Sequence, residues 1–205
     1  MKKKNACTLI ELLIVITIIA TLASLLMPNI SNTLTTARKS TAKNFFSQMI
    51  MAVERYKADF GAYPEFLTEK DRVNLADGNN TEYMVKSLTG KNPNLSQLSN
   101  ADSLKFNRTT QNYFTFDQSN LVKKNSVWKI VDTFGNPNIY VCVAKNGTIR
   151  RGYPTVADGI EESEFQELVP DLSMGIRKNV IMFTLKKDMN KDGADYEAEN
   201  IFSWY

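Results

Sequence analysis

The chain has 205 residues, of which 43% are hydrophobic and 23% are charged, as in an ordinary globular protein. Three of its 25 basic residues form the run Lys2–Lys4, and the remaining 22 are balanced by 22 acidic residues, so a nucleic-acid-binding surface is not expected. The sequence has no histidine, and it therefore lacks the commonest general base and the commonest zinc ligand. It also shows no nucleophile–base pair, phosphate-binding loop or redox motif, and we expect that the protein is not an enzyme.

An apolar segment follows the basic run. Residues 9–27 are apolar apart from Glu11 and a few small or hydroxylated side chains. At about 1.5 Å per residue, a helix of this length approaches the roughly 30 Å hydrocarbon core of a bilayer. We therefore predict a basic leader over residues 1–6 and a transmembrane helix over residues 7–28, with the amino terminus in the cytoplasm. The alternative is a secretory signal peptide, but the run exceeds the usual apolar length of about 7–15 residues.

Glu11 is a carboxylate placed inside this apolar segment. A charged side chain within a membrane helix costs a few kcal/mol, so such residues usually have a partner. Cleavage of the chain between Ala6 and Cys7 would create an ammonium group four residues before Glu11. That group could pair with Glu11 on the same helix or on a neighbouring subunit.

The stretch "ACTLIELLIVITIIATLASLLMP" resembles the type IV prepilin signature, which is a basic leader, a cleavage site and then Thr-Leu-Ile-Glu at the start of a long apolar helix. The resemblance implies that a prepilin peptidase cuts between Ala6 and Cys7 and methylates the new amino terminus. It also implies that Glu11 neutralises the amino terminus of an adjacent subunit during filament assembly. Pro28 stands where the family has a helix proline, and we expect a kink or a locally melted turn there. The family prefers glycine at the position of Ala6 and phenylalanine at that of Cys7; an uncut anchor is the alternative.

Helical periodicity continues beyond the apolar segment and predicts an amphipathic stem over residues 29–60. Its polar first part, residues 29–43, suits a helix shared between subunits, and its second part should pack on the protein's own core. Gly61 and Pro64 should end the helix, which we expect to run without interruption from Thr8 to about Phe60. The predicted core stripe consists of Phe46, Met49, Ile50 and Val53, flanked by Phe45, Ala52 and Tyr56.

The phrase "ERYKADFGAYP" resembles the helix end of the major pseudopilins of type II secretion systems, where it joins the stem to a globular head. We expect that head over residues 61–205. Residues 65–126 are rich in polar and turn-forming residues, and we interpret them as an extended loop region.

Strand patterns dominate the chain from Val127. We predict strands over Ile139–Ala144 and Thr148–Gly152, joined as a hairpin by Asn146-Gly147, and a further strand over Val180–Leu185. The segment "DTFGNPNIYVC" resembles the start of the pseudopilin sheet. We expect its Gly135 and Pro137 to form a turn rather than a binding site.

Near the carboxyl end, Asp188, Asn190 and Asp192 are spaced by two, a glycine follows, and Glu199 lies six residues beyond that glycine. This order fits the calcium-loop pattern D-x-[DN]-x-[DN]-G-x5-E, whose alternating oxygen ligands converge on one ion. An EF-hand is not expected, because the segment before the loop has a strand pattern. The alternative is a solvated acidic turn, and Asp195 and Glu197 could join an ion or face water.

Major pseudopilins resemble this region too, with an acidic, glycine-containing loop that binds calcium and a tail of the form Ile-x-x-Trp, here Ile201 and Trp204. The resemblance implies that Glu199 or Asn200 supplies the final ligands, together with the backbone carbonyl of Leu185. The expected cofactor is therefore Ca²⁺.

These expectations combine into an α+β, type IV pilin-like fold: a long amino-terminal helix, half transmembrane and half amphipathic, packed on a small antiparallel sheet, with an extended loop region and a carboxy-terminal ion-binding loop. The resemblance implies a single-pass inner-membrane protein with a periplasmic head, polymerised into a periplasmic pseudopilus that drives type II secretion. The expected partners are further copies of the chain, a prepilin peptidase, an inner-membrane assembly platform and minor pseudopilins. The alternatives are a type IV pilin for adhesion, motility or DNA uptake, and a membrane-anchored calcium-binding module that never polymerises.

Overall fold

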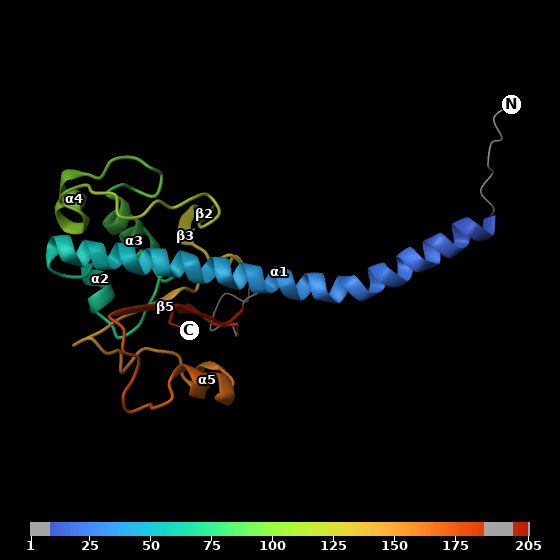
Figure 1. The fold of residues 1–205 in the computed structure, drawn as a ribbon. Coiled ribbons are helices and arrows are strands. Elements are labelled where there is room, and N and C mark those ends of the chain that lie inside the picture. The colour runs from blue at the N-terminus through green and yellow to red at the C-terminus, as the bar shows by residue number, and fades with distance from the viewer. Residues whose placement is uncertain (1–8, 187–198, 205) are drawn as a thin grey trace. The chain divides into compact units, whose positions relative to one another are not determined.

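The computed structural model describes residues 9–186 and 199–204. The chain divides into two compact units, Met1–Arg38 and Lys39–Tyr205, and each is described by itself. Helix α1 spans Leu9–Phe60, starting in the first unit and ending in the second (Figure 1). The predicted continuous helix is thus confirmed from Leu9 onward, while Thr8 lies outside the described residues.

The end of α1 has the predicted residues in the predicted roles. The backbone N–H of Gly61 donates to the carbonyl of Lys57 at 2.8 Å, and Gly61 has a φ of 75°. A residue with positive φ directly after the last helical turn is a common helix stop, and glycine adopts it without steric cost. Pro64 follows as the buried residue before the next helix.

The second part of α1 buries one face in the first of two hydrophobic cores. Every member of the predicted stripe lies in this core, with Ile50 partly buried at its edge. Partner residues come from helices, from the sheet and from loops far along the chain, so the stripe packs on the protein's own core as predicted. The buried residues that α1 contributes are Ala42, Phe45, Phe46, Met49, Ala52, Val53 and Tyr56.

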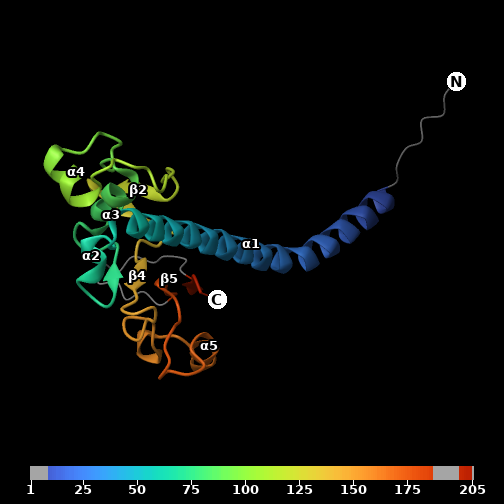
Figure 2. The same cartoon turned by 60° about the vertical axis from the view of Figure 1, so that its left-hand side comes forward.

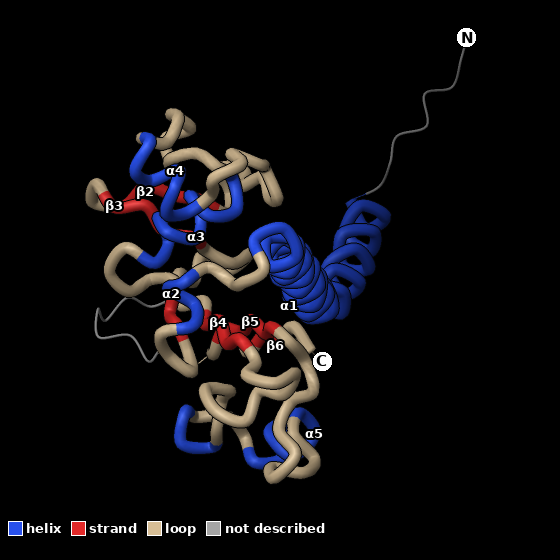
Figure 3. Tube along the Cα trace, turned by 90° about the vertical axis from the view of Figure 1, so that its left-hand side faces the viewer, coloured by secondary structure: helices blue, strands red, loops and turns tan. Residues whose placement is uncertain are grey.

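The main sheet has four antiparallel strands in the order β1-β4-β5-β6. Figure 3 shows β4, β5 and β6 side by side below the end of α1. The predicted strand over Val180–Leu185 is confirmed as β5. The strands are β1 (Val73–Asn74), β4 (Tyr140–Val143), β5 (Val180–Thr184) and β6 (Ile201–Phe202).

Both faces of this sheet are buried. Successive residues of a strand point to opposite faces, and Val141 and Met182 face the first core while Cys142 and Phe183 face a second one. Helix α5 (Glu162–Leu168) closes the second core with Phe165 and Leu168, on the side of the sheet away from α3 (Figure 2). This two-sided burial explains why "VIMFT" in β5 is almost entirely apolar instead of alternating.

The region 65–126 is folded, and its interpretation as an extended loop region was wrong where helices and short strands form. Helix α3 buries Met84, Val85 and Leu88 in the first core. Their helical spacing is hard to recognise in the sequence because the residues around them are polar. A two-residue turn at Asn125 and Ser126, both with positive φ, joins β2 to β3 in a separate two-stranded sheet. The elements here and next to this region are α2 (Glu65–Thr68), α3 (Asn80–Thr89), α4 (Asn100–Phe106), β2 (Leu121–Lys124) and β3 (Val127–Ile130).

The hairpin predicted at Asn146-Gly147 is reduced to its turn. Both residues have positive φ, but only Lys145 and Thr148 pair across the turn. Ile149 then pairs with Ile176 through two backbone hydrogen bonds of 2.9 and 3.0 Å, so the predicted strand Thr148–Gly152 does not form. Ile149 is buried in the second core instead of continuing the backbone pairing with β4. The short 3₁₀ helix η1 (Val156–Asp158) follows.

Candidate functional site

The first part of α1, residues 9–24, exposes large apolar side chains on all its faces. They fall at consecutive positions as well as at helical spacing, so they do not form a single stripe that one packing layer could cover. Hydrophobic side chains in this arrangement need an apolar surrounding on every side. The exposed residues are Leu9, Ile10, Leu12, Leu13, Ile14, Val15, Ile16, Ile18, Ile19 and Leu22.

The hydroxyl groups of this segment are satisfied within the helix itself. The side chains of Thr17, Thr21 and Ser24 each donate a 2.8 Å hydrogen bond to the carbonyl three residues earlier. A hydroxyl bonded in this way needs no water. The hydroxyl groups of the segment therefore do not require solvent, and Glu11 is its one charged residue.

Glu11 is the acidic residue of the first turn of α1 and is exposed. A carboxylate at this end of a helix is favoured by the helix dipole. Ala6 and Cys7, the predicted processing residues, lie outside the described residues, and their roles stay predictions. The backbone is helical across Pro28, so a melted turn is absent there and the kink stays a prediction.

Over the part of the chain that the structure describes, no helix combines the length and apolar character required of a membrane span.

The two ends of the predicted calcium loop are held together by the sheet. Thr184 of β5 pairs with Ile201 of β6, and the backbone N–H of Lys186 donates to Oδ1 of Asn200 at 2.7 Å. Nδ2 of Asn200 donates in turn to the Glu164 carboxylate of α5 at 2.9 Å. This arrangement closes the base of the loop and brings Leu185 close to Glu199 and Asn200.

Of the predicted calcium ligands, the structure describes three. Leu185 is buried, Asn200 makes the two hydrogen bonds just given, and the Glu199 carboxylate forms an ion pair with Lys39 at 3.1 Å. The central ligands Asp188, Asn190 and Asp192 lie outside the described residues. Within the described residues, no group of three or more acidic, cysteine or histidine side chains could hold a metal ion. The ion therefore stays a prediction.

The segment from Asp132 to Asn138 forms the turn that the sequence predicted. The Asp132 carboxylate accepts from the backbone N–H of Phe134 and of Asn136, at 2.8 and 2.9 Å, and Gly135 has a φ of 80°. The Thr184 hydroxyl of β5 donates to the other oxygen of Asp132 at 3.2 Å. Asp132 is 2% exposed, and burial raises its pKa although these hydrogen bonds oppose the shift. Asp132 thus ties the turn to the central strand.

Sequence reasoning missed Lys39 and Glu164, which complete the base of the carboxy-terminal loop. Lys39 and Glu199 lie 160 positions apart in the chain. No local spacing marks such a pair, because only the packing of α1 beside the sheet brings the two residues together.

Comparison with known families agrees with the amino-terminal signature. Residues 1–27 match the family described as the prokaryotic N-terminal methylation motif, the signal of type IV prepilins. The match supports a type IV pilin-like family for the chain, processed as prepilins are. No curated protein and no solved structure matches the chain in these comparisons. The α+β architecture of a long helix on a small antiparallel sheet is consistent with that family.

Proposed function

We propose that the protein is a structural subunit that polymerises through the first part of α1. The observation that supports this proposal is the methylation motif at residues 1–27 together with an apolar helix surface that stays exposed among the described residues. Before assembly a bilayer covers this surface, and after assembly the same segments of neighbouring copies cover it. A lipid or multi-helix surrounding is the environment in which a helix that is apolar on every side is stable.

In this proposal Glu11 sets the axial position of each subunit. Cleavage after Ala6 leaves an ammonium group on methylated Cys7, and the Glu11 carboxylate of a neighbouring copy pairs with it. In an apolar bundle a charge without a partner is strongly unfavourable, so only the register that pairs the two charges is stable.

The specific class of subunit that we propose is a pseudopilin of type II secretion, anchored in the bacterial inner membrane with its head in the periplasm. The helix end "ERYKADFGAYP" and the turn at Asp132 support it, since both stand where that family has them. A type IV pilin is the second candidate, because the folded region 65–126 adds the helices α2, α3 and α4 to the head, together with β2, the first strand of a separate hairpin. Deletion of the gene distinguishes the two: loss of protein export supports the pseudopilin, and loss of surface fibres supports the pilin.

The polymerisation proposal is tested by Glu11→Ala in the native host. We expect processed subunits, with a mass that starts at methylated Cys7, but no cross-linkable filaments, because the ammonium group loses its partner. Glu161→Ala is the matched control, since it removes an exposed carboxylate of the head. Wild-type protein that keeps residues 1–6 and stays monomeric would contradict the proposal.

We further propose that the carboxy-terminal loop binds Ca²⁺ through Asp188, Asn190 and Asp192, with Glu199 and the Leu185 carbonyl at its closed base. The ligand spacing and the joined loop ends support this. The ion pair of Glu199 with Lys39 is partly open to solvent, so Glu199 can exchange it for the ion.

Chelation should then lower the thermal stability of the full chain, because an ion that binds only the folded state stabilises it by about 2.7 kcal/mol at a hundred times its Kd. Melting curves with calcium and with chelator measure the shift. Asp192→Asn should abolish it, whereas Asp171→Asn, at an exposed turn, should keep it. Identical curves with and without calcium would refute the site.

A further inference from the structure

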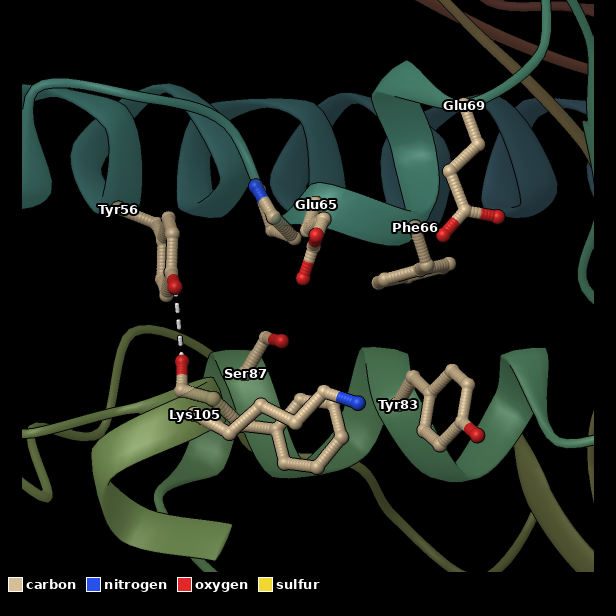
Figure 4. Close-up of a pocket in the computed structure, with 9 residues that line it drawn as sticks. Tyr56, Glu65, Phe66, Glu69, Tyr83, Ser87 and Lys105 are labelled. Atoms are coloured by element: carbon tan, nitrogen blue, oxygen red, sulfur yellow. Dashed lines mark hydrogen bonds between the residues drawn. The ribbon is translucent and has the colours of Figure 1, made fainter.

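A small pocket lies in the head between α2 and the neighbouring helices α3 and α4, away from both regions treated above. Its walls are aromatic: the ring of Tyr83 stacks on Phe106 at 5.1 Å and meets Phe66 edge-on at 5.9 Å. Tyr56 of α1 also lines it, and the Tyr56 hydroxyl donates to the Phe106 carbonyl at 2.8 Å. Figure 4 shows α2 above this pocket and Ser87 and Lys105 below it.

The hydroxyl of Ser87 is the first sign that the pocket receives a ligand. Ser87 is 1% exposed, and its Oγ has no hydrogen-bond partner in the described part of the chain. A helical serine or threonine commonly bonds back to the preceding turn, and Thr89 of the same helix does so with Val85 at 2.8 Å. The Ser87 Oγ instead points into the pocket (Figure 4). A buried hydroxyl without a partner costs about 1–3 kcal/mol, so an occupant that bonds to it is favoured.

The charges around the pocket favour a cation. Glu65 and Glu69 lie at its mouth, both exposed, and neither forms an ion pair within the described residues. The ammonium group of Lys86 lies 5.4 Å from the Phe106 ring centre but is already paired with Glu82 and Asp102. Lys105 supplies the ammonium group that lines the pocket. This ammonium lies 5.7 Å from the ring centre of Tyr83 and 5.3 Å from that of Phe106, within the range of a cation–π contact. The chain's own lysine thus shows that a cation fits beside these rings.

The size of the pocket limits what part of a ligand can enter. The space open to the centre of a water molecule is about 40 Å³, which equals about three waters. This volume suits an ammonium or guanidinium group with its last carbon, but not a drug-sized molecule, which needs about 300 Å³ or more. So few atoms bind weakly by themselves, at no more than about 1.5 kcal/mol per atom. The cation must therefore be held by further contacts outside the pocket, as a side chain of a protein is.

We propose that this pocket, lined by Phe66, Tyr83, Ser87 and Phe106 with Glu65 and Glu69 at its mouth, binds the cationic end of a lysine or arginine side chain presented by another protein chain. The incoming cation takes the position of the Lys105 ammonium, which swings into solvent. Its N–H groups donate to the two carboxylates and to the Ser87 hydroxyl. The site does not depend on polymerisation of α1.

The test uses the full chain, labelled with ¹⁵N and held in micelles of an uncharged detergent. Capped Gly-Lys-Gly and Gly-Arg-Gly peptides are titrated while the amide resonances of Ser87 and Tyr83 are followed by NMR. We expect saturable shifts with a Kd of about 1 mM, as for a single anchoring group without flanking contacts. Capped Gly-Gln-Gly and Gly-Glu-Gly should give none. A pocket that holds only water would show no saturation with any peptide, and this result would overturn the proposal, as would preferential binding of the acidic peptide.

Substitutions separate the cation site from a general surface effect. Glu65→Gln and Glu69→Gln should each weaken binding about two- to fivefold, the range of a partly exposed ion pair, whereas Glu161→Gln outside the pocket should leave it unchanged. Lys105→Gln should tighten binding, because the competing cation is gone. Unchanged binding in the Glu65→Gln/Glu69→Gln double variant would refute the proposal. Shifts of the same resonances on dilution without peptide would support it and identify a second copy as the partner.

Discussion

The two parts of α1 belong to one helix but have opposite surfaces. In the first part Leu13 and Ile16 are 50% and 54% exposed, and their neighbours on every face are apolar too. In the second part Phe46 and Val53 are fully buried, while the residues on the other face are mostly polar, with Met51 as an exception. A one-sided stripe is satisfied by a single packing layer, whereas an all-round apolar surface is not. The comparison teaches that one helix meets two requirements: the head covers the second part, and in the proposed function a bilayer or neighbouring copies cover the first.

The strongest test of the difference between the two parts of α1 is to truncate one large side chain in each part. Phe46→Ala should destabilise the head by about 3–5 kcal/mol, because it removes a fully buried ring and leaves a cavity. Leu13→Ala should change the free energy of unfolding of the head by no more than about 0.5 kcal/mol, since the side chain is half exposed and belongs to neither hydrophobic core. Denaturant unfolding of both full-length variants in detergent measures the two effects. Equal losses would show that the first part of α1 also belongs to the folded core.

A substitution remote from α1 sharpens the comparison by disturbing the packed unit alone. Gly152 has a φ of 81°, and a Cβ there would lie 2.2 Å from the Asp71 carbonyl oxygen. Gly152→Ala should therefore cost about 2–4 kcal/mol, from left-handed backbone strain and overpacking together. Gly135→Ala is the control, because Gly135 has a similar φ of 80° but open space around its Cβ position; it should cost about 1–2 kcal/mol. Equal costs, read from thermal melts, would show that backbone strain alone decides.

The smallest effect concerns pH and involves the packed unit only. Burial raises the pKa of Asp132 above its ordinary value of 3.8. Between pH 3.8 and the raised pKa, the folded state therefore binds more protons than the unfolded state. The contribution of Asp132 to stability is then fully present below pH 3.8 and is lost as the pH rises through the raised value. Asp132→Asn keeps the shape and the hydrogen-bond acceptor and should flatten this part of the stability–pH curve. A variant curve parallel to that of the wild type would contradict the shift.

Local pattern predicted the elements that depend on local chemistry. The stripe from Phe45 to Tyr56, the helix end at Gly61, the strand β5 and the turn at Asp132 all carry their signal within a few residues. The same reasoning failed for α3, because its three buried apolar residues stand among polar ones, and the segment looks rich in turns. It also failed for the strand after Asn146-Gly147, where the turn was correct but Ile176, 27 residues beyond Ile149, was the better partner.

The sequence by itself determined the methylation signal, the all-round apolar surface at the start of α1 and the amphipathic stripe at its end. These depend on residues close together in the chain, whose periodicity sets which face they share. Only the tertiary structure decided that both faces of the sheet are buried, that Lys39 meets Glu199 at the base of the carboxy-terminal loop, and that Ser87 opens onto an aromatic pocket. Each of these needs side chains from distant segments to meet, and no local spacing records which distant segments pack together.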